Sequence, residues 1–370
     1  MKNSDTNKIT EPARTFAFAA IHPYEETNIV SGEEKEIRGY DFISWGDNNS
    51  YPSYLQSLYE NVPTLQSVIN AVIDYVSGED VRLENKFDKA VNTKGDTPED
   101  LVRALTEDYA KFGGFAVNIT RNKGGEISSL DYISLEFLRS DKECERFFYS
   151  TEWSKGRRAQ FIEYPVFKAN SKDINSIFYY KNKINKVYPI PVYASAKKSC
   201  EIEKSIDEYH LNSVNNSFMG SYIINFANGI PSEKIQDEIE EEVNEKFSGK
   251  DNAGRIMISF SKDKDSAVTL QKLDTDDFGD KYQSLAKRSQ NQIFTSFRMS
   301  PALAGISVEG TVFDETSFKE GYKLFNKTTI LPMQKTLARA FSTIFGEDVL
   351  VIKPFDVNFE KEENNEEITN

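Results

Sequence analysis

Two long helical stretches in the second half constrain the fold of this chain more than any other feature of its sequence. Over residues 195–218, apolar side chains recur on or near one stripe of a helix, and a second such stretch covers about 276–298. Ser300-Pro301 ends the second stretch, because a proline restricts the residue before it and cannot continue the helical hydrogen bonding. The sequence therefore predicts two long helices separated by about sixty residues.

The residues between these helices predict a compact insert. Residues 222–226 and 255–260 are strand-like, and a helix starts at Pro231-Ser232, with apolar residues at every fourth position until Gly249. The order is that of a strand-helix-strand module. Its helix is acidic from Glu238 to Glu242, and a solvated face is the usual explanation for such a run.

The first half predicts helices followed by short strands. Pro52 and Pro63 suit the first turns of two helices, the second of which ends at Gly78, and Thr97-Pro98-Glu99-Asp100 is a typical start of a third. From 115 to 188 the pattern changes to β-rich runs, at 115–120, 127–133, 161–167 and 177–180. A mixed helix-and-sheet domain is expected.

The last part of the chain predicts one more long helix. It follows a loop at Gly305 and carries an apolar stripe from Phe318 to Ile344, with Pro332 inside it. Because proline removes an amide donor and clashes with the preceding turn, we expect a kink there. The acidic residues after Pro354 are expected to fray, and the first 36 residues show little periodicity.

Length and composition indicate a globular protein of two or three packed units. The chain has 370 residues, 38% of them hydrophobic, and a mean hydropathy of −0.56. Its apolar run at 16–21 is too short for an export signal or a membrane span. Cys144 and Cys200 have no CxxC spacing, which favours reduced thiols in a cytoplasm.

The net charge of −14 argues against a protein that grips duplex DNA, because such binding needs basic side chains that displace phosphate counterions. An acidic wall with sparse basic positions suits a conduit along which DNA slides. Acidity that simply keeps the protein soluble is the simpler explanation.

Catalytic signatures are missing from the sequence. It contains no GxxxxGK[ST], GxGxxG, HExxH or GxSxG motif. His22 and His210 have no nearby histidine or cysteine, so His210 is expected to be a surface or packing residue. The cluster of Asp274, Asp276, Asp277 and Asp280 lacks EF-hand order, and acids at a helix start explain it more simply. We expect no enzyme activity, cofactor or metal.

The order of motifs along the chain resembles the portal proteins of tailed bacteriophages, of the compact wing, stem and clip type. In the first half the resemblance rests on Trp45-Gly46, Asn49, Tyr51-Pro52, Leu58-Tyr59 and Pro63-Thr64. In the second half it rests on Tyr188-Pro189, Phe247-Ser248-Gly249, Asn252-Ala253-Gly254-Arg255, Ile293, Phe297, Ser300-Pro301 and the run from Leu303 to Gly305. Each motif is weak alone, and their joint order over about 42–345 carries the resemblance.

The resemblance implies an α+β portal fold with a mixed α/β wing, long stem helices, a strand-helix-strand clip, and a kinked helix after a tunnel loop. The implied divisions are a flexible N-terminal arm (1–36), the wing (37–194), stem helix 1 (195–219), the clip (220–272), stem helix 2 (273–299), the tunnel-loop region (300–316), the kinked wing helix (317–346), and a short C-terminal tail or minimal crown (347–370).

The implied function is a dodecameric ring at one capsid vertex of the virion, assembled in the bacterial host cytoplasm, through which double-stranded DNA passes without sequence preference. The implied partners are the large terminase, a head-tail adaptor and the major capsid or scaffold proteins, with no membrane. In a ring, each lumen-facing residue recurs as a circle of charge or bulk.

The resemblance also implies site residues. The tunnel loop closest to DNA comprises Ser307, Val308, Glu309, Gly310, Thr311, Val312 and Phe313, with a plain helix connector as the simpler interpretation. Lys287, Arg288, Lys319 and Lys323 are the candidate basic residues of the lumen. The docking surface of the clip comprises Glu238, Glu240, Glu241 and Glu242.

Two other functions stay open at this point. Another phage structural protein, such as a head-tail adaptor, also forms rings but need not keep two stem helices around a clip. An acidic α+β hydrolase would depend on one or two particular carboxylates, whereas a portal would show assembly defects from substitutions across the stem and clip.

Overall fold

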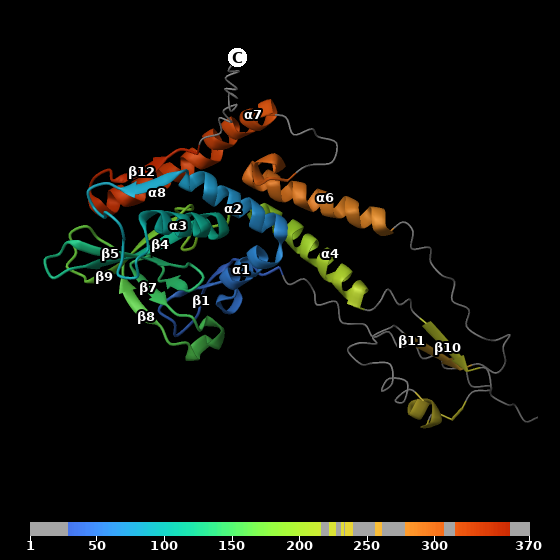
Figure 1. The fold of residues 1–370 in the computed structure, drawn as a ribbon. Helices are drawn as coiled ribbons and strands as arrows, with labels where there is room; N and C mark the ends of the chain where they lie inside the picture. Colours follow the sequence, from blue (N-terminus) through green and yellow to red (C-terminus); the bar gives the residue numbers. More distant parts are fainter. Residues whose placement is uncertain are drawn as a thin grey trace, which may run out of the picture. The chain divides into compact units, whose positions relative to one another are not determined.

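The computed structural model describes residues 29–215, 222–226, 231–232, 234–239, 256–260, 278–306 and 315–355 (Figure 1). The chain divides into two compact units. The larger comprises 29–203 and 286–370, and the smaller comprises 1–28 and 204–285. No described helix is long and apolar enough to cross a membrane.

Three helices of the larger unit begin and end at the residues that the sequence indicates. Helix α1 (Tyr51–Asn61) and helix α2 (Pro63–Ser77) both carry proline in the first turn, and Gly78 caps α2. Helix α3 (Pro98–Phe112) starts with a capping box, in which the Thr97 hydroxyl accepts from the Asp100 amide and the Asp100 carboxylate accepts from the Thr97 amide. All three predictions are confirmed.

Short antiparallel sheets complete the larger unit. The strands are β1 (Glu34–Glu36), β2 (Ile43–Trp45), β3 (Asp80–Leu83), β4 (Gly114–Arg121), β5 (Ile127–Ile133), β6 (Leu138–Ser140), β7 (Arg146–Tyr149), β8 (Ile162–Pro165), β9 (Asn175–Lys181) and β12 (Leu350–Lys353). They pair in the orders β1-β2, β12-β3, β5-β4-β9 and β6-β7-β8. The strands expected at 115–120, 127–133, 161–167 and 177–180 are confirmed as β4, β5, β8 and β9.

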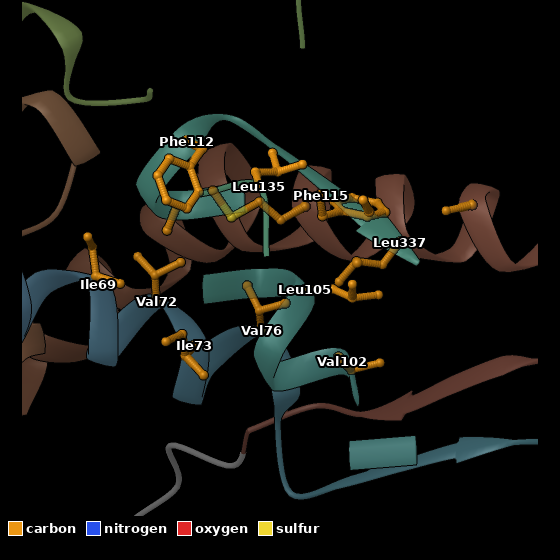
Figure 2. Packing of buried hydrophobic residues seen from close by; sticks show 14 of the residues in the cluster. Ile69, Val72, Ile73, Val76, Val102, Leu105, Phe112, Phe115, Leu135 and Leu337 are labelled. Carbon is orange, nitrogen blue, oxygen red and sulfur yellow. The ribbon is translucent and has the colours of Figure 1, made fainter. Parts of the chain in front are cut away.

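The core of the larger unit lies where α2, α3, β4 and the last helix meet. Figure 2 shows Ile69, Val72, Ile73 and Val76 of α2 facing the same interior as Val102 and Leu105 of α3, together with Leu337. Of these seven side chains, six are fully buried and Ile73 is 6% exposed. The three-and-four spacing of apolar residues in α2 therefore marks its packed face.

The two long helices expected at 195–218 and about 276–298 are present as α4 (Lys197–Asn215) and α6 (Phe278–Phe297), each of which contributes residues to both units. In the smaller unit, the Tyr209 and Tyr282 rings stack with centroids 5.0 Å apart. His210 is exposed, with its ring 6.0 Å from that of Tyr282, which confirms it as a surface packing residue. His22, Asp274, Asp276 and Asp277 lie outside the described residues.

The expected strand-helix-strand insert is confirmed where the structure describes it. Strand β10 (Tyr222–Phe226) pairs in parallel with β11 (Ile256–Phe260), and residues 234–239 between them are helical. Parallel strands need a crossover connection, which a helix commonly supplies.

The helix that contains Pro332 differs from the expectation. Helix α7 (Glu315–Phe325) and helix α8 (Leu331–Phe345) are joined by a π-helical turn over Asn326–Ile330, in which the Leu331 amide donates to the Asn326 carbonyl. Pro332 lies in the first turn of α8, where a missing amide donor costs little. The irregularity expected at Pro332 is thus a π turn that precedes the proline.

Two expectations at the ends of the chain need correction. Residues 347–370 are not a tail throughout, because β12 pairs with β3 along its whole length, with Leu350 opposite Leu83. Residues 1–36 are not an arm throughout, because β1 pairs with β2 and the Glu34 carboxylate accepts a hydrogen bond from the Tyr188 amide at 2.9 Å. Strand β1 consists of Glu-Lys-Glu and strand β12 of Leu-Val-Ile-Lys, so neither shows the alternation of apolar and polar residues that predicts a strand.

Candidate functional site

The chain leaves α6 through a series of tight turns that lead to the expected tunnel loop. Arg298 adopts a left-handed conformation, with φ 57°, and the next amide, that of Met299, donates to the Phe294 carbonyl. A 3₁₀ helix over Pro301–Ala304 follows and is capped by Gly305, with φ 73°. Glycine adopts this conformation without the steric cost of a Cβ atom. The residues before the loop are therefore tightly defined by the backbone.

Tyr75 of α2 contacts the chain on both sides of the loop. Its hydroxyl donates a hydrogen bond to the Leu303 carbonyl at 3.0 Å, before the loop. Its ring packs against Tyr322 and Phe325 of α7, after the loop, with centroids 5.5 and 5.9 Å away. One buried side chain thus holds the residues before the loop and the residues after it against α2.

Phe355 completes this aromatic cluster. Its ring lies 5.1 Å from that of Tyr75, and its carbonyl accepts a hydrogen bond from the Tyr322 hydroxyl at 3.2 Å. Burial raises the pKa of Tyr75, and the neighbouring Tyr322 and Asp74 raise it further, so its hydroxyl stays a donor at physiological pH.

The inner half of α6 is anchored in the core of the larger unit. Ile293, Phe294 and Phe297 are buried, and the Phe297 ring stacks on Tyr193 with centroids 5.8 Å apart. On the facing helix, the Ser199 hydroxyl donates to Gln292 Oε1. This half of α6 is therefore held by buried packing and a side-chain hydrogen bond.

The four candidate basic residues occupy two helices. Lys287 and Arg288 lie on the exposed side of α6, Lys323 is exposed on α7, and Lys319 is partly buried on α7. The seven expected tunnel-loop residues, Ser307, Val308, Glu309, Gly310, Thr311, Val312 and Phe313, lie outside the described residues, as do Glu240, Glu241 and Glu242.

Glu238 is the one residue of the expected clip surface that the structure describes. It is exposed and forms an ion pair with Lys234, one helical turn earlier, at 3.9 Å. An exposed pair of this kind contributes little to stability and leaves the carboxylate accessible.

Sequence reasoning missed further basic residues near the candidates. Lys327, Lys335 and Arg339 are exposed on the π turn and α8, where they continue the four-residue spacing of Lys319 and Lys323. Side chains four apart lie on one side of a helix, so the spacing was a signal that could have found them. Among the described residues, no cluster of three or more side chains could hold a metal ion.

Motifs from distant parts of the chain meet in the larger unit. The ring of Trp45 stacks on Tyr188 with centroids 4.5 Å apart and planes 3° apart. Arg139, only 1% exposed, donates to the carbonyl and the side-chain oxygen of Asn49 at 2.9 and 3.1 Å, and its guanidinium lies 5.0 Å from the Trp153 ring. The Trp45, Asn49 and Tyr188 motifs therefore meet at a single interior junction, and Arg139 is a member of it that no sequence pattern indicates.

A family model described as "Phage portal protein" matches residues 76–363. No curated protein matches the sequence. Among solved structures, the chain is similar to the neck of a native gene transfer agent (GTA) particle computed with C12 symmetry, with a TM-score of 0.53 and 13% identity over 89% of this chain and 87% of that chain.

Two other solved structures are similar. The virion of the native GTA particle gives a TM-score of 0.51 and 13% identity over 82% of this chain and 83% of that chain. The crystal structure of an HK97 family phage portal protein from Corynebacterium diphtheriae gives a TM-score of 0.49 and 10% identity over 81% of this chain and 94% of that chain. The likeness to the GTA structures shows a shared fold.

Proposed function

The chain belongs to the phage portal protein family, and on this premise we propose that its copies close into a dodecameric ring at one capsid vertex, through which double-stranded DNA is packaged and ejected. The observation that carries the proposal is the family match over residues 76–363, a span that includes α3, the strands from β3 to β12, α4, the insert, α6, α7 and α8. A GTA neck computed with C12 symmetry shares the fold, which supports the twelvefold ring.

Exposed apolar side chains on the stem helices support assembly. Ile202 and Leu211 on α4 are 39% and 61% exposed, and Leu285 on α6 is 43% exposed. A head-to-tail interface repeated around an axis would cover such residues in every subunit at once. Ring assembly would then bury apolar side chains that are exposed to water in a single chain. Each Å² of apolar surface buried in this way stabilises the ring by about 25 cal/mol.

A ring explains how an acidic chain with few basic residues could still contact DNA. One lysine on the lumen side becomes a collar of twelve, so Lys287, Arg288, Lys319 and Lys323 could meet phosphates without a high basic content. Sparse contacts hold DNA weakly, because affinity for the duplex grows with the number of neutralised phosphates. DNA can then slide past the wall.

The loop at 307–313 is proposed to face the DNA. Tyr75 holds the residues on both sides of the loop, so the loop can respond to DNA without moving the core. The acidic residues Glu238, Glu240, Glu241 and Glu242 are proposed to dock the large terminase and then the head-tail adaptor, while the wing contacts the major capsid or scaffold proteins. The subunit has no catalytic role in this account, and the ring resides in the virion after assembly in the host cytoplasm.

Packaging tests the function. A variant with 307–313 shortened is expected to assemble into rings and to incorporate into capsids, but to package or retain less DNA than the unaltered chain. Ile184→Ala, at a side chain that is 97% exposed, is the control and should package normally. Normal DNA content in the shortened variant would remove the loop from the mechanism, and capsids that fill without any copy of this chain would overturn the function itself.

A further inference from the structure

The segment that forms α7, the π turn and α8 is net positive, whereas the whole chain is net negative. Residues 315–345 carry five basic side chains and two acidic ones, in a chain with a net charge of −14. The basic residues are Lys319, Lys323, Lys327, Lys335 and Arg339, and the acidic ones are Glu315 and Glu320. We call the exposed side chains from Lys323 to Arg339 the basic face.

The π turn keeps the basic face in line. On the inner side, Phe325 and Ile330 are both buried although they are five positions apart, because a π turn holds more residues than an α turn. On the outer side, Lys323, Lys327 and Lys335 stay exposed, and Leu324 and Leu331 beside them are 65% and 40% exposed. The face thus combines positive charge with apolar contact area.

Within the described ranges, no carboxylate forms an ion pair with Lys323, Lys327, Lys335 or Arg339. The acid next to α8, Glu347, is paired with Lys86 at 2.6 Å, and Glu79 is paired with Lys353. The basic face therefore offers four cations to an anionic partner.

The chain continues from Phe355, which lies beside α7, into an acidic segment. Phe355 is fixed beside α7, because its carbonyl accepts from the hydroxyl of Tyr322, the residue next to Lys323. The following residues, 356–370, contain six carboxylates and one lysine. The acids are Asp356, Glu360, Glu362, Glu363, Glu366 and Glu367, and Val357 and Phe359 lie among them.

The segment is long enough to cover the face. Fifteen residues reach up to about 50 Å when extended, whereas the sixteen helical steps from Lys323 to Arg339 span about 24 Å. Tethering at Phe355 gives the segment an effective concentration on the order of millimolar. Weak exposed ion pairs can then produce substantial occupancy.

We propose that the acidic segment 356–370 binds the basic face of the same chain, with its carboxylates on Lys323, Lys327, Lys335 and Arg339 and its apolar residues against Leu324 and Leu331. The segment thereby competes with other polyanions for this face, and at Lys323 it competes with the duplex DNA of the proposed lumen contact. The inference stands independently of ring assembly, since both partners belong to one subunit.

Crosslinking in the full chain tests the contact. A carbodiimide, which joins carboxylates directly to amines, is expected to link Glu360–Glu367 to Lys323, Lys327 or Lys335. The internal controls are Lys89, Lys123, Lys172 and Lys183, exposed lysines elsewhere in the larger unit. Equal linking to these four would overturn the proposal. In a mixture of isotope-labelled and unlabelled chains, links between two chains would overturn the assignment to the same chain.

Peptide binding tests the charges. A labelled peptide of residues 356–370 is expected to bind a full chain whose five glutamates at 360, 362, 363, 366 and 367 are replaced by glutamine, and to bind more weakly as salt rises. Adding Lys323→Gln, Lys327→Gln, Lys335→Gln and Arg339→Gln should weaken binding at least about tenfold, as four lost ion pairs predict. The same four-charge change at Lys89, Lys123, Lys172 and Lys183 should have little effect.

Two results would contradict the proposal. The peptide could fail to bind, or bind both charge variants equally. Alternatively, duplex DNA could bind the glutamine-substituted chain through the basic face without competition from the peptide, which would identify the face as a nucleic-acid surface instead.

Discussion

The hydroxyl of Tyr75 donates a hydrogen bond to the carbonyl of Leu303, 228 residues later in the chain, at 3.0 Å. This bond fixes the backbone immediately before the proposed tunnel loop, while the same ring packs on Tyr322 after it. The geometry of the loop therefore depends on a residue of α2 that belongs to neither of its flanking helices.

Tyr75→Phe should loosen the start of the loop. It removes the donor and leaves a buried carbonyl unpaired, at a cost of about 1 kcal/mol. The Gly305 and Ile306 amides, which donate to Ala302 and Pro301, should then exchange hydrogen up to about fivefold faster.

Tyr59→Phe is the matched control, because the Tyr59 hydroxyl donates to Asn70 Oδ1 at 2.9 Å, on a contact between α1 and α2. It should leave exchange at Gly305 and Ile306 unchanged. Equal exchange in wild type and Tyr75→Phe would show that the hydrogen bond does not hold the loop.

Arg139→Met should strongly destabilise the larger unit. The guanidinium satisfies the carbonyls of Asn49, Glu136 and Leu138 at 2.8–2.9 Å, and each buried acceptor left unpaired costs about 1–3 kcal/mol. Chemical denaturation should show a loss of about 3 kcal/mol or more. Arg146→Met, at a half-exposed guanidinium paired with Asp141 and Glu163, should cost about 1 kcal/mol or less. Similar losses for both would contradict the role of Arg139.

Gly78→Ala should disrupt the contact between the end of α2 and strand β12. Gly78 has φ 65°, and a Cβ atom there would lie 2.0 Å from the Lys353 carbonyl oxygen. Gly346→Ala separates strain from the clash, because Gly346 has φ 79° and no atom within 4 Å of the added Cβ. The control should cost about 1–2 kcal/mol and Gly78→Ala clearly more, as measured by thermal unfolding. Equal costs would mean that β12 does not approach Gly78 so closely.

Asp108 should make stability fall as pH rises through the range below neutrality. Burial raises its pKa to about 7, although Lys111 and hydrogen bonds from the Leu135 amide and the Tyr132 hydroxyl act to lower it. Between the ordinary value of 3.8 and about 7, the folded state therefore binds more protons than the unfolded state. The free energy of unfolding then decreases with rising pH, by up to about 1.4 kcal/mol per pH unit.

Asp108→Asn removes this titration while keeping an oxygen acceptor for the Leu135 amide. Urea denaturation at pH 5 and pH 8 should show a larger drop for wild type than for the variant, and the other titrating groups cancel in that comparison. Parallel pH profiles for the two proteins would show that Asp108 does not titrate in this range.

The helices of this fold follow from local sequence signals, whereas the short strands do not. Proline in the first turn, the Thr97 capping box and Gly78 mark the ends of α1, α2 and α3 because these residues satisfy helix termini chemically. Strands β1, β3 and β12 have three or four residues each and pair with partners distant in sequence or equally short. Such pairing depends on tertiary contacts that no local window contains.

Some residues of the candidate site follow from a local sequence pattern, and others do not. Lys319 and Lys323 were selected from position in the sequence, and Lys327, Lys335 and Arg339 extend their spacing across a π turn that Pro332 only hinted at. Tyr75 and Arg139 carried no signal, because their roles depend on partners far along the chain, at Leu303 and Asn49. For a tyrosine on an apolar helix face, the sequence pattern predicts only a core residue, because the partner of its hydroxyl is not known from the sequence.

Electron microscopy of the purified chain shows whether its copies close into rings. We expect closed rings, twelvefold in symmetry, around a channel wide enough for duplex DNA, in which neighbouring copies would cover the exposed apolar residues of α4 and α6. Monomers or closed globules alone, over a broad range of protein concentration, would contradict the account.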